Sequence, residues 1–150
     1  MKLKQLTSLF KRDLDRFKNE LEMFPPKYLW VTSGSIENSA GVLAQHTAGN
    51  LQHYIGYGMG NTSYQRDRET EFSETGADKN DLIQKLDDAQ KAVITTLSGL
   101  DDDALKANCP KDFPVKMTNE ELLLQLYGHL NYHLGQLNYL RRIFEDPITS

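Results

Sequence analysis

The sequence has few of the features that mark a secreted or membrane protein. Its 150 residues include one cysteine, Cys109, so no disulfide can form within the chain and a disulfide-rich secreted scaffold is excluded. No apolar run approaches the roughly 18 residues of a membrane span. The first residues alternate charged side chains with leucine instead of forming the apolar core of a signal peptide. These absences predict a cytoplasmic protein with no membrane partner.

An excess of positive charge is also missing. The chain carries 17 Lys and Arg against 21 Asp and Glu, for a formal net charge of -4 and a pI of about 5.5. Because the basic residues are scattered along the chain, they form no electrostatic footprint for nucleic acid, and we expect no nucleic-acid partner. There is no internal repeat or linker, and the length is typical of one core. Residues 1–150 are therefore predicted to form a single domain.

Hydrophobic residues recur at steps of three and four along four long segments, which is the spacing of helices with one buried face. The segments are 2–24, about 38–57, 78–99 and 118 to about 144. Pro25 and Pro26 end the first segment, since proline cannot continue a helix. Asp78 is a suitable N-cap for the third, and Thr118 has the spacing of a capping box with the glutamate three residues later.

The remaining segments connect these helices. Residues 61–77 have no hydrophobic period and are predicted to form a long crossing loop. Residues 101–107 are expected to add one helical turn, residues 108–117 an extended excursion or a short hairpin, and Pro147 to end the last helix. The fold class is therefore all-α, a four-helix bundle with a long crossing loop between its second and third helices.

All four histidines lie on only two of these helices. His129 and His133 are four residues apart and fall in the middle of a leucine stripe, so their rings lie one turn apart and point into the bundle. An unpaired buried polar group costs about 1–3 kcal/mol, and a shared metal ion would remove that cost. Gln136, one turn beyond His133, is placed to orient a ligand or a substrate.

A second inward polar stripe lies on the second helix, where His46, Asn50 and His53 follow the i, i+4, i+7 spacing. Facing helices of a bundle can share a metal site. One histidine of this stripe and the pair at 129 and 133 would supply three nitrogen ligands and leave one position open for water or substrate. His53 has the weaker claim, because it lies two turns further along than His46. A buried histidine can also be a hydrogen-bonded packing residue, and this alternative stays open.

A run of charged residues in the crossing loop has two interpretations. Arg66, Arg68, Glu69 and Glu71 are usually expected to form a solvated charge run. A loop that crosses the end of the bundle could instead carry an arginine or a glutamate to the site.

Two segments around the histidines resemble the motifs of a known family. Leu43-Ala-Gln-His-Thr-Ala-Gly-Asn-Leu51 and Gly128-His-Leu-Asn-Tyr-His-Leu-Gly-Gln-Leu137 look like the two histidine motifs of DinB-like, or YfiT-like, metalloproteins. Residues 60–72 resemble the equivalent stretch of a small uncharacterised bacterial branch. The resemblance implies a four-helix bundle, often a homodimer, that binds zinc or nickel through His46, His129 and His133. His53 lies outside that triad, and Asn50 stands where some relatives have an acidic residue.

The resemblance also implies a first function. Some members transfer low-molecular-weight thiols such as bacillithiol to electrophiles, so the partners would be a small-molecule thiol and an electrophile. The residues do not determine which metal is bound, because three imidazoles suit zinc, nickel, copper or iron. The exposed tyrosines expected at positions 127, 132 and 139 add only a slight indication of a dimer interface.

Two other functions remain. A metal-dependent hydrolase would use the ion to activate water, but Asn131 and Tyr132 stand between the histidines where an HExxH enzyme has its glutamate. A carboxylate at position 69 or 71 would then have to reach in from the loop. A non-catalytic metal-binding or ligand-binding protein of stress physiology is the third. No catalytic residue is assigned.

Overall fold

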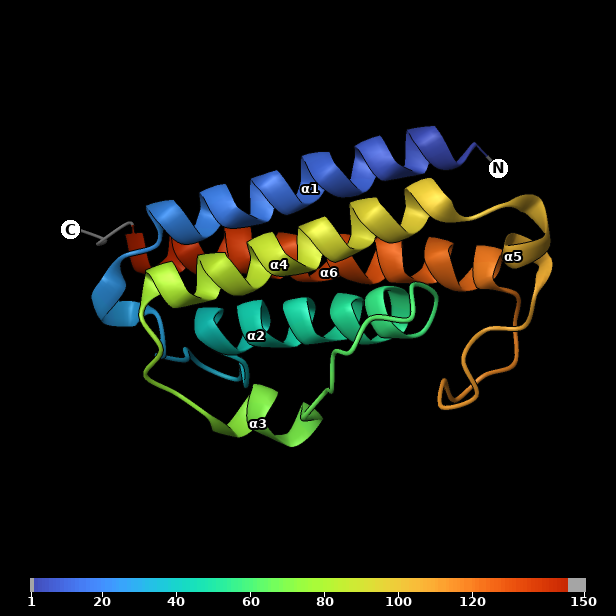
Figure 1. Cartoon of the computed structure of the whole chain (residues 1–150). Helices are drawn as coiled ribbons and strands as arrows, with labels where there is room; N and C mark the ends of the chain where they lie inside the picture. The colour runs from blue at the N-terminus through green and yellow to red at the C-terminus, as the bar shows by residue number, and fades with distance from the viewer. Residues whose placement is uncertain (1, 146–150) are drawn as a thin grey trace.

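The computed structural model describes residues 2–145 and consists of four long helices packed side by side (Figure 1). These are α1 (Leu3–Met23), α2 (Ala40–Leu51), α4 (Lys79–Gly99) and α6 (Asn119–Glu145). Helices α1 and α2 each contact both α4 and α6, so the bundle has the cyclic order α1, α4, α2, α6. The predicted all-α four-helix bundle is confirmed, and the two histidine-bearing helices, α2 and α6, are neighbours.

Side-chain caps explain where α2, α4 and α6 begin. The Ser39 hydroxyl accepts a hydrogen bond from the Val42 amide at 3.2 Å, and the Asp78 carboxylate accepts one from the Asp81 amide. The capping box of α6 forms in both directions, because the Thr118 amide donates to the Glu121 carboxylate and the Glu121 amide donates to the Thr118 hydroxyl. Pro147, predicted to end α6, lies outside the described residues.

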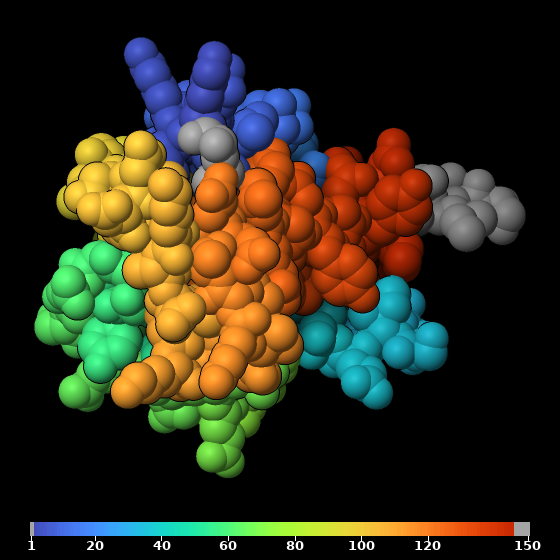
Figure 2. Space-filling view, turned by 90° about the vertical axis from the view of Figure 1, so that its right-hand side faces the viewer, coloured from blue at the N-terminus to red at the C-terminus, as the bar shows by residue number. Residues whose placement is uncertain are grey.

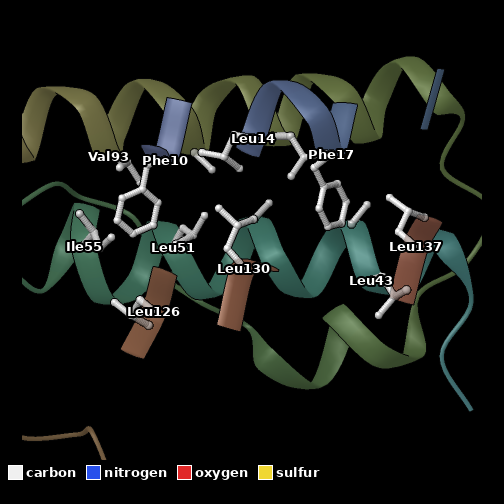
Figure 3. Packing of buried hydrophobic residues seen from close by; sticks show 14 of the residues in the cluster. Phe10, Leu14, Phe17, Leu43, Leu51, Ile55, Val93, Leu126, Leu130 and Leu137 are labelled. Carbon is white, nitrogen blue, oxygen red and sulfur yellow. The ribbon is translucent and has the colours of Figure 1, made fainter. Parts of the chain in front are cut away.

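The core is formed by the inward faces of all four helices (Figure 3). Phe10 and Phe17 of α1, Leu51 of α2, Val93 of α4 and Leu130 of α6 are almost inaccessible to solvent. Burying a side chain of this kind contributes about 1.5–3 kcal/mol. This packing fixes the position of α2 along α6, and the relative positions of the histidines on these two helices depend on it. None of the helices in residues 2–145 is both long and apolar enough to cross a membrane.

The connections differ from the sequence expectation in two places. Helical structure does extend to Tyr57, but only as far as Leu51 is it the α-helix α2. The next six residues, Gln52–Tyr57 (η2), form a π-helical turn, a rare conformation that is frequent at functional sites. Within the predicted crossing loop 61–77, residues Arg68–Ser73 form a short helix, α3, which packs on α2. The Asp67 carboxylate caps α3 by accepting from the Thr70 amide at 3.2 Å.

Of the other short elements, α5 and the hairpin were predicted and the turn η1 was not. Pro26–Tyr28 (η1) form a 3-10 turn and Asp102–Lys106 form the short helix α5. Residues 108–117 are a short hairpin, because Asn108 and Thr118 form an antiparallel bridge and the Cys109 amide donates to the Met117 carbonyl at 2.9 Å. Figure 2 looks onto the end of the bundle where α5 and this hairpin lie.

A buried carboxylate between α1 and α6 was not predicted. Asp13 is fully buried and accepts hydrogen bonds from Arg12, from the Tyr127 hydroxyl at 2.5 Å and from the Asn131 amide at 3.1 Å. Burial alone would raise the pKa of Asp13, but these hydrogen bonds hold it below the ordinary 3.8. Tyr127 is therefore half-buried, contrary to the expectation that it is exposed, whereas Tyr132 and Tyr139 are exposed.

Candidate metal centre

Three imidazole rings converge between α2 and α6. His46 Nε2 lies 3.3 Å from His129 Nε2, and His133 Nε2 lies 3.0 Å from the same atom. One ligand atom from each of the three histidines lies within 4.8 Å of the others. His46 and His133 are buried and His129 is half-buried. The three-histidine group could therefore bind a metal ion, with its open side at His129.

The spacing and the protonation of these rings fit a cation. Two imidazole nitrogens bound to one zinc ion at tetrahedral angles are separated by about 3.3 Å, as follows from the Zn–N length. Burial, together with the neighbouring His133, His46 and Arg66, lowers the pKa of His129 to about 4. Burial likewise lowers the pKa of His133. These two imidazoles are therefore neutral near pH 7, the form in which histidine binds a metal.

The opposite nitrogens of two of these rings have hydrogen-bond partners. His46 Nδ1 lies 3.2 Å from Glu71 Oε1, and His133 Nδ1 lies 2.7 Å from Gln136 Oε1. Because an ionised carboxylate only accepts hydrogen bonds, it favours the tautomer of His46 with the proton on Nδ1. The lone pair on Nε2 then faces the cluster. A partner of this kind on the outer nitrogen is the usual arrangement for metal-binding histidines.

A buried ion pair orients His46. Arg66 holds both oxygens of Glu71, with Nε 2.8 Å from Oε2 and Nη2 2.8 Å from Oε1. Burial would raise the pKa of Glu71, but the hydrogen bonds from Arg66 and His46 lower it below its ordinary value, so Glu71 is a carboxylate. Gln45 of α2 fixes the same segment, because its side-chain amide donates to the Glu71 and Glu74 carbonyls, both at 3.1 Å.

The close approach of Glu71 to α2 depends on a glycine. A Cβ atom at Gly49 would lie 1.9 Å from Glu71 Oε2 and 2.6 Å from its Cδ. Any other residue at this position would displace the carboxylate from beneath His46. Gly49 lies one turn beyond His46 on the same helix, so one segment of α2 supplies both the imidazole and the space for its partner.

A cleft of about 310 Å³ opens onto the cluster. His46 and His129 line it, while His133 is not among its lining residues. Its other walls come from four parts of the chain: Asn50 and Tyr54 of α2 and η2, Arg66 and Arg68 before and within α3, Phe113 and Pro114 of the hairpin, and Gln125 and Leu126 of α6. The volume is at the lower limit of small-molecule sites.

The structure separates the remaining site candidates. Asn50 lines the cleft beside His46, and its buried Oδ1 has no hydrogen-bond partner within residues 2–145. Gln136 contacts His133, as its position on α6 predicts. His53 is not part of the three-histidine group, and its Nε2 instead contacts the Asp112 carboxylate of the hairpin. The ring of His53 also stacks on that of Tyr57, with centroids 5.8 Å apart.

Sequence reasoning only partly anticipated Glu71 and Arg66. Both belong to a run for which the sequence predicts a solvated surface, yet both side chains are less than 10% exposed. Arg68 and Glu69 of the same run are exposed, as expected. The alternative interpretation, in which the crossing loop brings a charged residue to the site, is the one the structure supports. Asp67 followed by Glu69 and Glu71 is the pattern of a helix start, and it was the signal that could have located α3.

Comparison with known proteins identifies the family. The model of the DinB superfamily matches residues 9–137, so the chain belongs to the DinB superfamily. No curated protein sequence matches it.

Solved structures share the fold. A DinB-like protein from Bacillus cereus is 17% identical with a TM-score of 0.76, covering 97% of this chain and 94% of its own. A conserved protein from Enterococcus faecalis is 18% identical with a TM-score of 0.74, covering 95% and 96%. A DinB-like protein from Bacillus subtilis, YjoA, is 17% identical with a TM-score of 0.72, covering 96% and 94%. At these identities the likeness concerns the fold alone.

Proposed function

We propose that this protein is a metal-dependent thiol S-transferase whose divalent ion, zinc or nickel, is held by His46, His129 and His133. The observation that supports the metal site is the convergence of three imidazole nitrogens, two of them 3.3 and 3.0 Å from the third. A bound ion would stabilise a thiolate at neutral pH and make its sulfur available to an electrophile.

The residues around the ligands have separable tasks in this proposal. Glu71 and Gln136 hold the rings of His46 and His133 through Nδ1. Arg66 keeps Glu71 ionised and in place. Asn50 lines the cleft, but its unpaired Oδ1 is buried, so we assign it no contact with substrate. Thiol transfer needs no protein nucleophile, and none of the residues in 2–145 that line this cleft is a serine, threonine or cysteine.

Hydrolysis is the alternative reaction, and the position of Glu71 argues against it. A general base must accept a proton from the attacking water. Both oxygens of Glu71 are already engaged by Arg66, and Oε1 also faces His46. Glu69 is exposed and is not among the residues that line the cleft. A non-catalytic metal-binding protein of stress physiology is the remaining alternative, and the experiment below distinguishes it.

The decisive measurement is the metal content of tag-free protein by inductively coupled plasma mass spectrometry. We expect near one equivalent of zinc or nickel in the parent protein and in His53→Ala, and a loss of that metal in the double variant His129→Ala, His133→Ala. His53→Ala is the matched control, because it removes a histidine of the same bundle that lies outside the three-histidine group. Circular dichroism should give the same helicity for all three proteins.

Turnover then separates the functions. We expect the loaded protein to join small thiols to a chloroaromatic electrophile, with release of chloride and of the thiol proton to solvent, and not to cleave esters or amides. Ester or amide cleavage alone, abolished by His133→Ala, would replace the transferase with a hydrolase. One equivalent of metal with no turnover of either kind would favour the non-catalytic role. No metal after incubation with zinc and nickel would mean that the histidines are packing residues.

The homodimer and the cytoplasmic location remain proposals. Tyr132 and Tyr139 on α6 are 64% and 69% exposed, and Ile143 on the same helix is 50% exposed, so this helix presents apolar surface. Light scattering during size-exclusion chromatography would give twice the monomer mass of 17.1 kDa if the proposed dimer forms.

A further inference from the structure

The charge of the cleft differs from the charge of the whole molecule. The chain has a formal net charge of -4, yet the described residues that line the cleft include two arginines and no carboxylate. Clefts lined by one sign of charge favour ligands of the opposite sign. The lining therefore suits an anion more than a cation.

The two arginines are not equivalent. Arg66 is paired with Glu71 through both of its oxygens, so its charge is compensated inside the protein. No carboxylate within residues 2–145 forms an ion pair with Arg68, which is exposed at the edge of the cleft. Its guanidinium lies 5.1 Å from the centre of the Phe72 ring, and that ring is 4.9 Å from the ring of His46. Phe72 thus holds the free positive charge beside the three-histidine group.

Another wall of the cleft is aromatic. Tyr54 of η2 and Phe113 of the hairpin both line it, and their rings meet edge to face with centroids 5.1 Å apart. The contact between His53 and Asp112, one residue before Phe113, ties the hairpin to η2. Such rings attract flat apolar groups beyond the effect of the area that those groups bury.

We propose that this cleft takes a small molecule that combines an aromatic part with an anionic group, and that Arg68 is the residue that binds the anion. The aromatic part lies against Tyr54 and Phe113, and the anionic group lies at Arg68 beside Phe72. This inference rests on the proposed function in one respect, since it names the class of substrate that the metal-dependent reaction uses. Binding itself can be measured without turnover.

The test compares phenylacetate with its uncharged analogue phenylacetamide by ligand-observed nuclear magnetic resonance titration of the full chain at pH 7. We expect phenylacetate to bind about 1.5 to 5 times more tightly at low salt, which is the range of an exposed charge contact. This preference should shrink in 0.3 M sodium chloride, because salt screens exposed charges. Acetate, which lacks the ring, should bind more weakly than phenylacetate.

Two arginine variants identify the residue responsible. Arg68→Gln should remove the preference for phenylacetate. Arg142→Gln is the matched control, because Arg142 also lies over an aromatic ring, that of Tyr139, but is outside the cleft. It should leave the preference unchanged. Equal binding of the two ligands by the parent protein, binding of neither at millimolar concentration, or a preference that survives Arg68→Gln would each overturn the proposal.

The double variant His129→Ala, His133→Ala separates this inference from the proposed function. A carboxylate that binds the metal ion directly would lose its advantage in that variant, whereas one held by Arg68 would keep it. A preference that disappears with the histidines and is insensitive to Arg68→Gln would overturn the assignment to Arg68. Metal content and thiol turnover of the parent protein would still test the proposed function independently.

Discussion

Replacing Gly49 by alanine tests the arrangement beneath His46. The added Cβ would lie 1.9 Å from Glu71 Oε2, so the carboxylate must move. The end of a glutamate side chain moves easily when it is free. Here both of its oxygens are held by Arg66, and one also faces His46 Nδ1. The cost of the substitution is therefore the cost of separating a buried ion pair.

The magnitude follows from two opposing effects. Removing the partner of a buried charge costs about 3–5 kcal/mol, and the Arg66 side chain is only 8% exposed. Replacing glycine by alanine inside a helix stabilises the helix by about 1 kcal/mol. We expect Gly49→Ala to lower the free energy of unfolding by about 2–4 kcal/mol. At about 2–4 °C per kcal/mol for a chain of this size, Tm should fall by about 4–16 °C.

Urea denaturation of metal-free protein, followed by circular dichroism, measures this change. Gly128→Ala is the control, since within residues 2–145 a Cβ at Gly128 would meet no atom within 4 Å other than the adjacent backbone of its own helix, α6. It should raise stability by about 0.5–1 kcal/mol. Competition with a chromophoric chelator should show that Gly49→Ala alone weakens zinc binding, by about 10–100-fold. Equal unfolding midpoints and equal zinc affinities for the two variants would refute the reasoning.

Three further predictions concern other parts of the bundle. Tyr127→Phe should lower the free energy of unfolding by about 1–2 kcal/mol at pH 7, because it removes a hydrogen bond to ionised Asp13. The lowered pKa of Asp13 stabilises the fold above pH 3.8, so the difference in stability from the parent should shrink as the pH falls through that lowered pKa. A difference that stays constant with pH would contradict this prediction. In urea denaturation, Leu130→Ala should lower the free energy of unfolding by about 2–5 kcal/mol, and Leu124→Ala, at an exposed position, should lower it by less than about 0.5 kcal/mol. Equal losses of stability would mean that the core is misplaced. Asp112→Asn should leave the urea midpoint nearly unchanged, because the Asp112 side chain is 55% exposed, but it should speed proteolytic cleavage within residues 108–117. An unchanged cleavage rate would show that the contact with His53 does not hold the hairpin.

The helices could be predicted from the sequence because the interactions that start and end them are local. The caps at Ser39, Asp78 and Thr118 involve residues three positions apart, and the hydrophobic period repeats every three or four positions. The same periodicity placed His133 among leucines that are now seen to be buried. The turn Gln52–Tyr57 shows the limit of this reasoning, since a π-helical turn leaves no distinct spacing in the sequence.

The surroundings of the histidines depend on contacts between distant segments. Glu71 reaches His46 across 25 positions, and Asp112 reaches His53 across 59. Neither pair has a sequence spacing that a helix or a turn would reveal. The fully buried position of Asp13 likewise arises from α6, whose Tyr127 hydroxyl and Asn131 amide supply its partners.

By itself, the sequence determined the number and extent of the long helices and which of their faces are apolar, because each depends on neighbours within one helical turn. Only the tertiary structure decided that α2 lies beside α6, that Gly49 leaves room for Glu71, and that His53 contacts Asp112 of the hairpin. Those outcomes depend on the path of the crossing loop and on the packing of side chains far apart in the chain, which no local pattern encodes.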